Sequence, residues 1–339
     1  MNDMTAAEEI REIGICGATA TGKSALAILL AERLGGEIVS CDSMQIYKGM
    51  DIGTAKPTRE ELARVPHHMI GFLDPGTAYS CAQYVQDAQK VIDDIKSRGK
   101  IPIVCGGTGL YLESIYYRNR FSDSDISPTE ASAKRDELLS YAREFGNDAL
   151  HRRLRDIDPE AAAAIHPSNT RRVARAIEIY ETTGVTKTEW DKKSRNGEHV
   201  NMTVIMLQYK ERASQQRAIK VRCRKMIEDG LEHEVRELYN AGLITNGKTA
   251  GQAIGYKEFI PYFSGMESVR AAQDKFFHAT CRYAKHQETW FRHKEYVNRI
   301  YVDDVISGKL TMEEVADMAA AMYSEKRDGD GGSKQPDAE

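Results

Sequence analysis

The sequence predicts an α/β fold, in which a parallel sheet flanked by helices is interrupted by an all-helical insertion. Three observations support this prediction. Strand and helix patterns alternate over the first 120 residues, as is typical of a parallel sheet with helical connections. From 130 to 183 the pattern is helical, with no strand candidate. Strand character returns at 202–209, so the sheet is expected to continue after the insertion.

The first strand and helix enclose a glycine-rich loop, "ICGATATGKSAL" at 15–26. Residues 13–16 form a short apolar strand, and residues 25–34 form a helix that the Gly35-Gly36 pair ends. The leucines of this helix fall on one face: Leu26, Leu29, Leu30 and Leu34.

The loop itself fits the phosphate-binding pattern G-x-x-x-x-G-K-[ST] without a gap. Successive backbone N–H groups of such a loop surround phosphate oxygens, Lys23 adds a positive charge, and the Ser24 hydroxyl can bind Mg²⁺. A glycine-rich turn with a chance lysine is the alternative, but the order strand, loop, helix favours phosphate. The fold class is therefore P-loop NTPase-like, with these binding residues: Gly17, Ala18, Thr19, Ala20, Thr21, Gly22, Lys23 and Ser24.

The remaining elements follow in order along the chain. Strands are expected at 38–41 and 101–105, with a helix at about 80–98 between them. "SDSDISPTE" (122–130) is a polar linker, and helices dominate from 210 to about 323, with a possible short strand at "RIYV". We divide the chain into a first core part, a helical insertion, a second, helix-rich core part and a disordered tail, at 1–121, 122–199, 200–323 and 324–339.

Composition limits the cellular setting. The chain has 339 residues, 41% of them hydrophobic and 29% charged, and no apolar run approaches the ~20 residues of a membrane span. The N-terminal stretch is acidic and lacks a secretory apolar region. The six cysteines are scattered without a C-x-x-C pair, which argues against zinc and for reduced thiols. We expect a cytoplasmic protein without a membrane partner.

The charge distribution keeps a polyanionic partner open. The net charge of −4 argues against coating of nucleic acid through bulk charge. Local basic clusters nevertheless occur at 169–175, 210–225 and 281–294, and the second carries seven Lys and Arg against one acid. Most such runs are solvated helix faces, so this signal alone decides nothing.

The acidic residue that accompanies the phosphate loop is unusually placed. ATPases and GTPases usually have an Asp at the end of an apolar strand, whereas "IPIVC" continues into "GGTGLYL". Asp42 instead follows the second strand, at the sheet edge where ligands bind. By spacing alone, Asp42 is equally a Mg²⁺ ligand, a general base or a turn cap.

Several motifs occur together and in order: "GATATGKS", "SCDSMQIYKGMDIGTAKP", "PHHMIGFLDP", "YSCAQY", "IPIVCGGTGLYL", "NTRRVARAIEIYE", "AIGYKE" and "QETWFR". The set resembles the bacterial tRNA dimethylallyltransferases, also called tRNA isopentenyltransferases, over residues 13 to about 295. These enzymes prenylate an adenosine of the anticodon loop. The resemblance implies a phosphate loop that holds dimethylallyl diphosphate, a channel across the sheet, and an insertion that grips the tRNA anticodon stem-loop.

The resemblance also implies roles for individual residues. Lys23, Mg²⁺ at Ser24 and Arg222 would stabilise the diphosphate leaving group. Arg222 lies off the apolar stripe of its helix, although a solvated helix face is its alternative. Asp42 would be the general base for the adenine amine, and Thr108 would contact both the base and the diphosphate.

An adenine in a folded loop must flip out of its stack to enter such a channel. By resemblance, three segments supply RNA contacts. A less specific expectation is that Arg282, Lys285 and Arg292, which share a helix face, contact RNA phosphates. We expect a monomer. The three segments are Asp42, Ser43, Met44 and Gln45; Arg171, Arg172, Val173, Ala174 and Arg175; and Gln252, Ala253, Ile254, Gly255, Tyr256 and Lys257.

Other residues receive structural interpretations. His67 and His68 point to opposite faces of a strand, so we expect one packed and one exposed ring rather than a metal pair. Trp190, Trp290, Phe291 and the Tyr116-Tyr117 pair are expected in the core or at an interface. Thr21 is unusual in the family loop, and residues 119–135 align poorly with the family.

Three competing functions differ in what they need. A transferase acting on free adenine nucleotides would share the loop, base and channel but would not need the insertion at 122–199. A P-loop small-molecule kinase would need an acid after "IPIVC". An RNA-binding module without catalysis would not need Lys23, Ser24 and Asp42 together.

Overall fold

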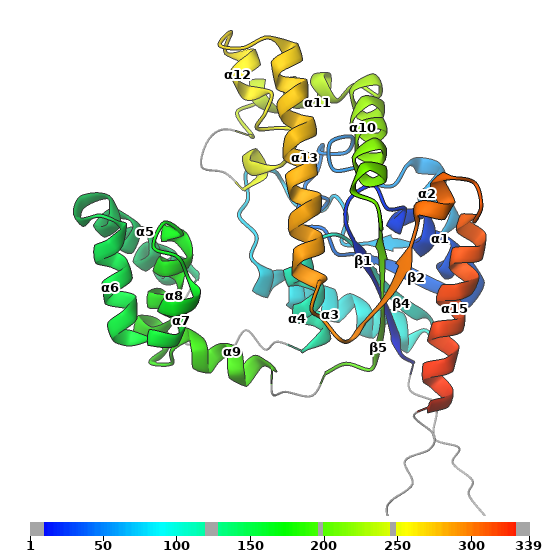
Figure 1. The fold of residues 1–339 in the computed structure, drawn as a ribbon, viewed down its shortest axis with the longest axis horizontal. Helices are drawn as coiled ribbons and strands as arrows, with labels where there is room; N and C mark the ends of the chain where they lie inside the picture. Colours follow the sequence, from blue (N-terminus) through cyan, green and yellow to red (C-terminus); the bar gives the residue numbers. More distant parts are fainter. Residues whose placement is uncertain (1–9, 119–127, 196–198, 245–248, 330–339) are drawn as a thin grey trace, which may run out of the picture. The chain divides into compact units, whose positions relative to one another are not determined.

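The computed structural model describes residues 10–118, 128–195, 199–244 and 249–329. Six strands in these ranges form one fully parallel sheet in the order β3-β2-β4-β1-β5-β6 (Figure 1). The predicted parallel α/β fold is therefore confirmed. The strands are β1 Glu12–Gly17, β2 Gly36–Ser40, β3 His67–His68, β4 Ile101–Cys105, β5 Met202–Gln208 and β6 Val297–Tyr301.

The sheet topology places the phosphate loop at a point where the connections diverge. β1 lies between β4 and β5, with Ile13 beside Ile103 and Thr203. After β1 the chain passes over β4 to β2, whereas after β4 it passes over β1 to β5. Ligands of open α/β sheets bind in the crevice outside the strand ends at such a point. The loops after β1 and β4 border this crevice.

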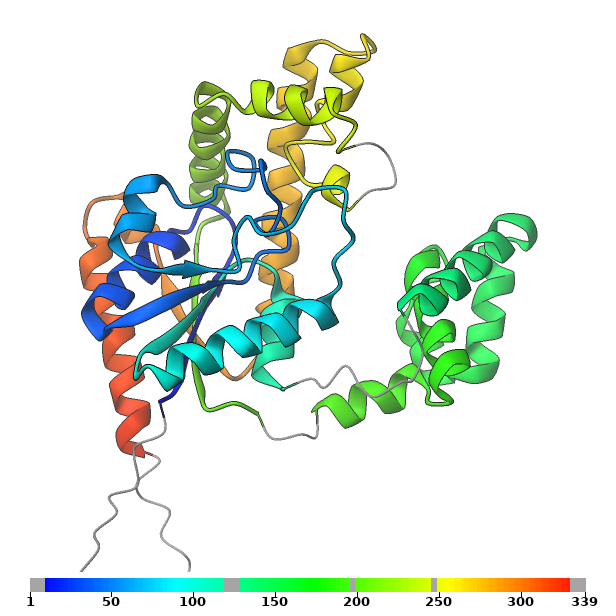
Figure 2. The same cartoon turned by 180° about the vertical axis from the view of Figure 1, so that it is seen from behind.

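Helices cover both faces of the sheet (Figures 1 and 2). On one face, α1 (Lys23–Leu34) packs with α15 (Met312–Gly329) over an apolar core that includes Ile13 and Ile15 of β1. On the other face, α4 (Gly109–Tyr116) comes close to β1, because a Cβ at Gly14 would lie 3.3 Å from Leu112. α3 (Cys81–Ser97) packs beside α4 on the strands β2 and β4.

A second apolar core lies above the carboxyl ends of the strands. It is built around the buried rings of Tyr47, Tyr256, Phe259 and Phe276. Helices α10 (Arg212–Glu228), α11 (Leu231–Asn240), α12 (Ile260–Phe263) and α13 (Val269–Phe291) surround it, together with the short helix η1 (Ala250–Gln252). Because residues 44–55 pack against the same core, this cluster positions the chain that follows Asp42. Two further short helices are α2 (Arg59–Arg64) and α14 (Asp303–Ile306).

The chain divides into two compact units, residues 1–116 with 200–339, and residues 117–199. The second unit has its own buried core, which includes Leu138, Leu150 and Val173. Its helices are α5 (Pro128–Phe145), α6 (Asn147–Ile157), α7 (Pro159–Ala164), α8 (Thr170–Thr183) and α9 (Lys187–Arg195).

Two expected boundaries differ from the structure. α5 begins at Pro128, inside the predicted polar linker, because proline and the acidic Glu130 are favourable in a first helical turn. α15 continues to Gly329, into the predicted tail, and Tyr323 of this helix still packs on the sheet core. The remaining parts of the predicted linker and tail, 122–127 and 330–339, lie outside the described residues.

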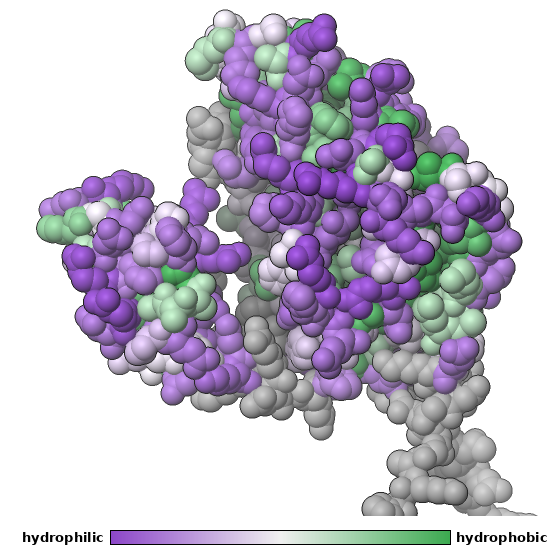
Figure 3. All heavy atoms as spheres, viewed as in Figure 1, coloured by the Kyte–Doolittle hydropathy of each residue, from purple (hydrophilic) through white to green (hydrophobic). Residues whose placement is uncertain are grey.

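The visible surface is mainly hydrophilic, with apolar side chains in small separate groups (Figure 3). Within the described ranges, no helix is both long and apolar enough to cross a membrane. All six cysteines are free thiols.

Candidate active site

The segment expected to bind phosphate, residues 17–24 (the phosphate loop), forms a tight loop between β1 and α1. Gly17 and Gly22 have φ angles of 135° and 90°, which glycine adopts at little cost. A Cβ at Gly17 would also lie 2.2 Å from the carbonyl oxygen of Leu207. The Thr21 hydroxyl donates a hydrogen bond to the Ala18 carbonyl oxygen over 2.8 Å. The loop therefore accommodates the unusual threonine through its own backbone.

Lys23 begins α1, and its ammonium group turns back over the loop. Its Nζ donates a hydrogen bond to the Ala18 carbonyl oxygen over 2.7 Å. Burial lowers the pKa of Lys23 to about 8, Arg222 contributes in the same direction, and Asp42 acts against the shift. Two cations near one loop disfavour each other's charge until an anion lies between them. The electrostatics of the loop thus favour an anionic ligand.

Asp42 follows β2 and caps the turn that comes next. Its Oδ1 accepts hydrogen bonds from the backbone N–H of Met44, over 2.8 Å, and of Gln45, over 3.4 Å. The turn-cap interpretation is therefore realised geometrically. Both bonds use Oδ1, and the carboxylate also lines the cavity of the phosphate loop. Capping and a chemical role are thus compatible in this residue.

Thr108 connects the loop after β4 to the turn at Asp42. Its Oγ1 accepts a hydrogen bond from the Ser43 N–H over 3.1 Å, and its own N–H donates to the Cys41 carbonyl oxygen over 3.1 Å. Gly106 allows this approach, because a Cβ there would lie 2.0 Å from the Cys41 carbonyl oxygen. The "GGTG" segment thereby fixes the backbone on both sides of Asp42.

Arg222 projects from α10 toward the same region. Its neighbours Ile219, Cys223 and Met226 are buried in the second apolar core, whereas Arg222 is half-buried beside the phosphate loop. Burial lowers its pKa, and the nearby Asp42 counteracts this shift. Arg222 therefore does not lie on a fully solvated helix face.

Two cavities meet at these side chains. The first, of about 170 Å³, is lined by the phosphate loop, and the second, of about 310 Å³, extends toward η1. The two cavities are adjacent and share part of their walls beside Asp42, and we call the pair the passage. The outer side of the phosphate loop opens into a wider cleft of about 1220 Å³. The residues that line both smaller cavities are Thr19, Asp42, Thr54, Arg222 and Tyr283.

Sequence reasoning missed Gln287, which joins the two loops of the site. Its Oε1 accepts a hydrogen bond from the Thr19 N–H over 2.9 Å, and its Nε2 donates to the Gly107 carbonyl oxygen over 2.9 Å. Gln287 is buried and lines the first cavity. Its only sequence signal was its place in the "QETWFR" motif. Nothing in the local pattern indicated that α13 would reach the phosphate loop.

The segments expected to contact tRNA divide into cavity-facing, exposed and buried residues. Ser43, Met44, Gln252, Ile254 and Lys257 line the second cavity, together with Ala253. In α8, the side chains of Arg171, Arg172 and Arg175 are exposed. Arg175 also forms an ion pair with the buried Glu178.

Four of the residues expected to contact tRNA have structural surroundings instead. Val173 and Ala174 are fully buried in the core of the second unit, so their side chains cannot meet RNA. The Tyr256 ring is fully buried, and Gly255 has a φ of 91° that serves the local turn. For these four, only the backbone is left to contact RNA, because a contiguous motif on a helix or turn includes inward-facing residues. That they contact tRNA stays a prediction.

The three cations that we expect, less specifically, to contact RNA phosphates line one cavity of about 680 Å³. Arg282, Lys285 and Arg292 of α13 and its C-terminal end line it together with Lys210 and Arg212. Glu288 also faces this cavity and accepts a hydrogen bond from Gln215, while burial raises its pKa.

The histidine pair differs from its expectation. Both rings are half-buried in β3, a two-residue strand at the edge of the sheet. His67 Nδ1 lies 2.9 Å from the Val65 carbonyl oxygen, and His68 Nε2 lies 2.8 Å from Glu37 Oε2. The prediction of one packed and one exposed histidine was wrong.

The aromatic residues largely occupy packed positions. Phe291 is fully buried, and Tyr116 is buried and stacks on Tyr296 with 4.1 Å between ring centroids. Trp190 is half-buried. Trp290 is 37% exposed and lies against Gly109, where a Cβ would be 2.5 Å from its ring.

The donor atoms at the loop suit a hard divalent cation. Ser24 and Asp42 line the first cavity and offer a hydroxyl and a carboxylate oxygen. Mg²⁺ prefers oxygen ligands, keeps several waters, and is often bound through one or two protein groups plus substrate phosphates. Across the described residues, no group of three or more His, Cys, Asp or Glu could hold a metal by itself. Substrate phosphates would therefore have to complete the coordination.

A glycine-rich loop of the phosphate-binding pattern at the switch point of a parallel sheet, with an aspartate on the wall that two cavities share, defines a P-loop-like fold. Residues 45–294 match the IPP transferase family model, and residues 11–74 match the isopentenyl transferase model. The chain belongs to the IPP transferase family.

Named relatives agree with this assignment. The chain is 43% identical to the tRNA dimethylallyltransferase of Caldanaerobacter subterraneus subsp. tengcongensis, covering 87% of this chain and 93% of that protein. It is also 43% identical to the Geobacillus thermodenitrificans enzyme of the same name, over 89% of this chain and 93% of that protein.

Solved structures show the same similarity. The full-length tRNA isopentenylpyrophosphate transferase from Bacillus halodurans is 38% identical, with a TM-score of 0.69 over 95% of this chain and all of that chain. A eukaryotic dimethylallyltransferase studied acting on tRNA is 27% identical, with a TM-score of 0.78 over 93% of this chain and 80% of that chain.

Proposed function

We propose that this chain transfers the dimethylallyl group of dimethylallyl diphosphate to the N6 amine of the adenosine 3′ of the anticodon (position 37) in tRNA, releasing diphosphate. The observation that carries the proposal is the placement of Lys23, Arg222 and Asp42 on the walls of two adjacent cavities. The first cavity suits the diphosphate, and the second suits the incoming adenine.

The first half of the chemistry concerns the leaving group. The bond between C1 of the donor and its diphosphate oxygen breaks, and the electron pair stays with the diphosphate. Lys23 and Arg222 stabilise this negative charge in a poorly solvated site, where charge stabilisation is strongest. Backbone N–H groups of residues 17–24 hold the phosphates, as in other loops of this type. Mg²⁺ bound through Ser24 would neutralise further charge on the diphosphate.

The second half concerns the acceptor. The adenine amine is a poor nucleophile, because its lone pair is delocalised into the ring. Asp42 accepts the N6 proton as the new bond between N6 and C1 forms, and passes it to solvent afterwards. Thr108 supports this step by holding the backbone at Ser43, next to Asp42.

The RNA must present a flipped nucleotide to reach Asp42. Unstacking costs a few kcal/mol, which contacts to base and phosphate offset. We infer that Gln45, Gln252 and Lys257 contribute such contacts near the cavities, and that the exposed arginines of α8 contact the stem-loop. Because one chain supplies Lys23, Asp42 and Arg222, the proposal requires only a monomer, and we place its tRNA substrate and the enzyme in the cytoplasm.

The experiment that tests the proposal is incubation with labelled dimethylallyl diphosphate and Mg²⁺, with either an anticodon stem-loop or AMP, followed by nucleoside analysis. We expect label on N6 of a single adenosine in the stem-loop. Preference for AMP would replace the proposal by the free-nucleotide reaction. A kinase is disfavoured because β4 is followed by Gly106 and Gly107 rather than an acid.

A further inference from the structure

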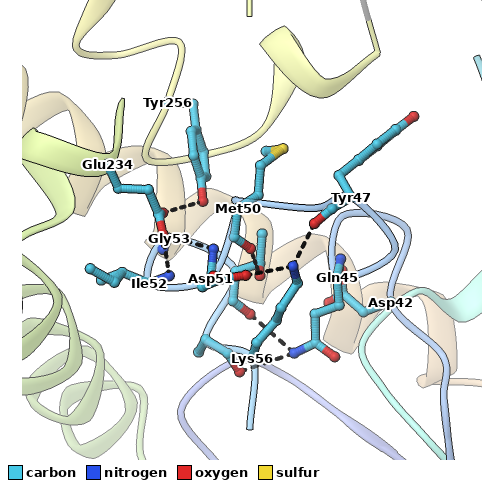
Figure 4. Close-up of polar contacts among 12 residues, drawn as sticks. Asp42, Gln45, Tyr47, Met50, Asp51, Ile52, Gly53, Lys56, Glu234 and Tyr256 are labelled. Atoms are coloured by element: carbon cyan, nitrogen blue, oxygen red, sulfur yellow. Dashed lines mark hydrogen bonds and ion pairs between the residues drawn. The ribbon is translucent and has the colours of Figure 1, made fainter. Parts of the chain in front are cut away.

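The segment Met50–Lys56 lies beside the site and is held by polar side chains from other parts of the chain (Figure 4). Glu234 of α11 is the main one. Its Oε2 accepts hydrogen bonds from the backbone N–H of Asp51 and of Ile52, each over 2.7 Å, and its Oε1 accepts from the Gly53 N–H over 3.0 Å. One carboxylate thus binds three consecutive backbone donors, as an anion binds in a backbone nest.

The Glu234 carboxylate is itself fixed in place. The Tyr256 hydroxyl donates to Glu234 Oε1 over 2.6 Å, and the Tyr256 ring is fully buried. The ring also contacts the segment, because a Cβ at Gly53 would lie 2.4 Å from it. Glu234, Tyr256 and Gly53 therefore form a tight junction between α11 and the segment.

The other end of the segment is held separately. Gln45 Nε2 donates to the Thr54 carbonyl oxygen over 3.1 Å and to the Ala55 carbonyl oxygen over 3.0 Å. Lys56 Nζ donates to Asp51 Oδ1 over 2.6 Å and so links the two ends of the segment. Ala55 has a φ of 49°, a conformation that disfavours non-glycine residues and persists only where the surroundings enforce it.

This held segment forms walls of the passage. Thr54 lines both smaller cavities, Gly53 lines the second, and Ala55 lines the first and the outer cleft. A prenyl chain that runs from the phosphate loop into the second cavity would cross the wall that the two cavities share, and Thr54 is part of this wall. The position of the segment therefore sets the space that the chain can fill.

We propose that Glu234 is a positioning residue that fixes segment 51–55 as a wall of the donor passage and thereby restricts the enzyme to short prenyl chains. This inference rests on the proposed transfer from dimethylallyl diphosphate. Glu234 does not touch the reacting groups, and its effect reaches them through the backbone of Gly53 and Thr54.

The test compares Glu234→Gln with Glu237→Gln, a matched change at an exposed position of the same helix. For each protein, kcat and KM are measured with dimethylallyl and with geranyl diphosphate, using the stem-loop as acceptor. In Glu234→Gln, we expect kcat/KM for dimethylallyl diphosphate to fall about 10- to 100-fold, because misplaced walls misalign the donor. The ratio of geranyl to dimethylallyl kcat/KM should rise by at least about tenfold. Glu237→Gln should match the unmodified chain.

Hydrogen exchange of the amides at 51–53 supplies a second readout, and it should accelerate in Glu234→Gln alone. If that variant does not fold, Glu234→Asp retracts the carboxylate while keeping its charge and should show the same change of ratio. A folded Glu234 variant with an unchanged geranyl to dimethylallyl ratio would overturn the inference. Failure of the unmodified chain to prenylate the stem-loop would instead refute the proposed function.

Discussion

Replacing Lys23 with methionine removes the ammonium group over the phosphate loop while keeping a side chain of similar length. In the unmodified chain, we expect the affinity for a diphosphate to depend on pH through Lys23. Because burial and Arg222 lower the pKa of Lys23 to about 8, its ammonium form is lost as the pH rises through that value. Only the ammonium form attracts a diphosphate, which is itself ionised above neutral pH.

The magnitude follows from this pKa. If a bound diphosphate keeps Lys23 protonated, only the free enzyme with a protonated Lys23 can bind it. With a pKa of about 8, the protonated fraction of the free enzyme falls by about 25-fold between pH 7.5 and 9.5, and the Kd should rise by the same factor. Neighbouring thiols do not titrate in this window, since burial raises the pKa of Cys105 to about 12 and that of Cys16 further. The assay is calorimetric titration with an unreactive thio-analogue of the donor at five pH values.

Lys23→Met should bind the analogue weakly and without this pH dependence. An equal rise of Kd with pH in Lys23→Met, or a flat profile in the unmodified chain, would refute the reasoning about Lys23.

The same group predicts an effect on stability. The folded-state pKa of about 8 lies below the ordinary value of 10.5, so the folded state disfavours the charged form. The resulting destabilisation is fully present below pH 8 and disappears as the pH rises from about 8 to 10.5. Without ligand at pH 7, Lys23→Met should therefore raise the free energy of unfolding, measured by urea denaturation. The gain should be smaller than the ~3 kcal/mol of the full pKa shift, because the side chain is half-buried and its hydrogen bond to Ala18 is also lost.

Four further changes test other parts of the site. Asp42→Ala should lower kcat for transfer by about 10²- to 10⁴-fold and change tRNA affinity by no more than a few-fold. Asp42→Asn keeps the acceptor oxygen of the turn cap and should be equally slow. Near-normal turnover in either variant would leave Asp42 as a turn cap only. Arg222→Ala should weaken diphosphate binding by a few kcal/mol in the same calorimetric assay; a change confined to the salt dependence of tRNA binding would assign it to the RNA surface. Gln287→Leu should weaken donor binding by about 1 to 3 kcal/mol, because Thr19 and Gly107 lose their shared partner; unchanged binding would make the bridge dispensable. Deleting 124–197 and inserting a Gly/Ser linker should leave a folded core that binds the donor analogue but no longer prenylates tRNA; retained transfer in nucleoside analysis would exclude the insertion from RNA binding.

Much of the fold could be predicted from local patterns. The phosphate loop is specified by Gly17, Gly22 and Lys23, because backbone angles and a charge requirement leave few alternatives at those positions. The apolar strands of the sheet are short, uninterrupted runs of apolar residues followed by loops, so the sequence also predicts them. The helix ends at Pro128 and Gly329 differ from the predicted ones, since the polar composition of both segments favoured a linker and a tail over helix.

The sequence identified candidate residues more readily than it assigned their roles. Asp42 was recognised, but its competing roles could not be separated, because the choice depends on where the carboxylate oxygens lie. The structure places one oxygen on a turn and the side chain on a cavity wall. In the motif at 171–175, the sequence could not distinguish the exposed arginines from Val173 and Ala174, which face the core of their unit.

The sequence by itself determined the phosphate loop, the parallel α/β pattern and the helical insertion, because these depend on residues close together in the chain. Only the tertiary structure decided that Gln287 bridges the loops after β1 and β4, and that Glu234 binds the backbone of residues 51–53. Both contacts join segments about 180 or more residues apart. Both contacts are hydrogen bonds to backbone groups, which nearly every residue carries. The identity of the bound residue therefore does not indicate that its backbone has a side-chain partner.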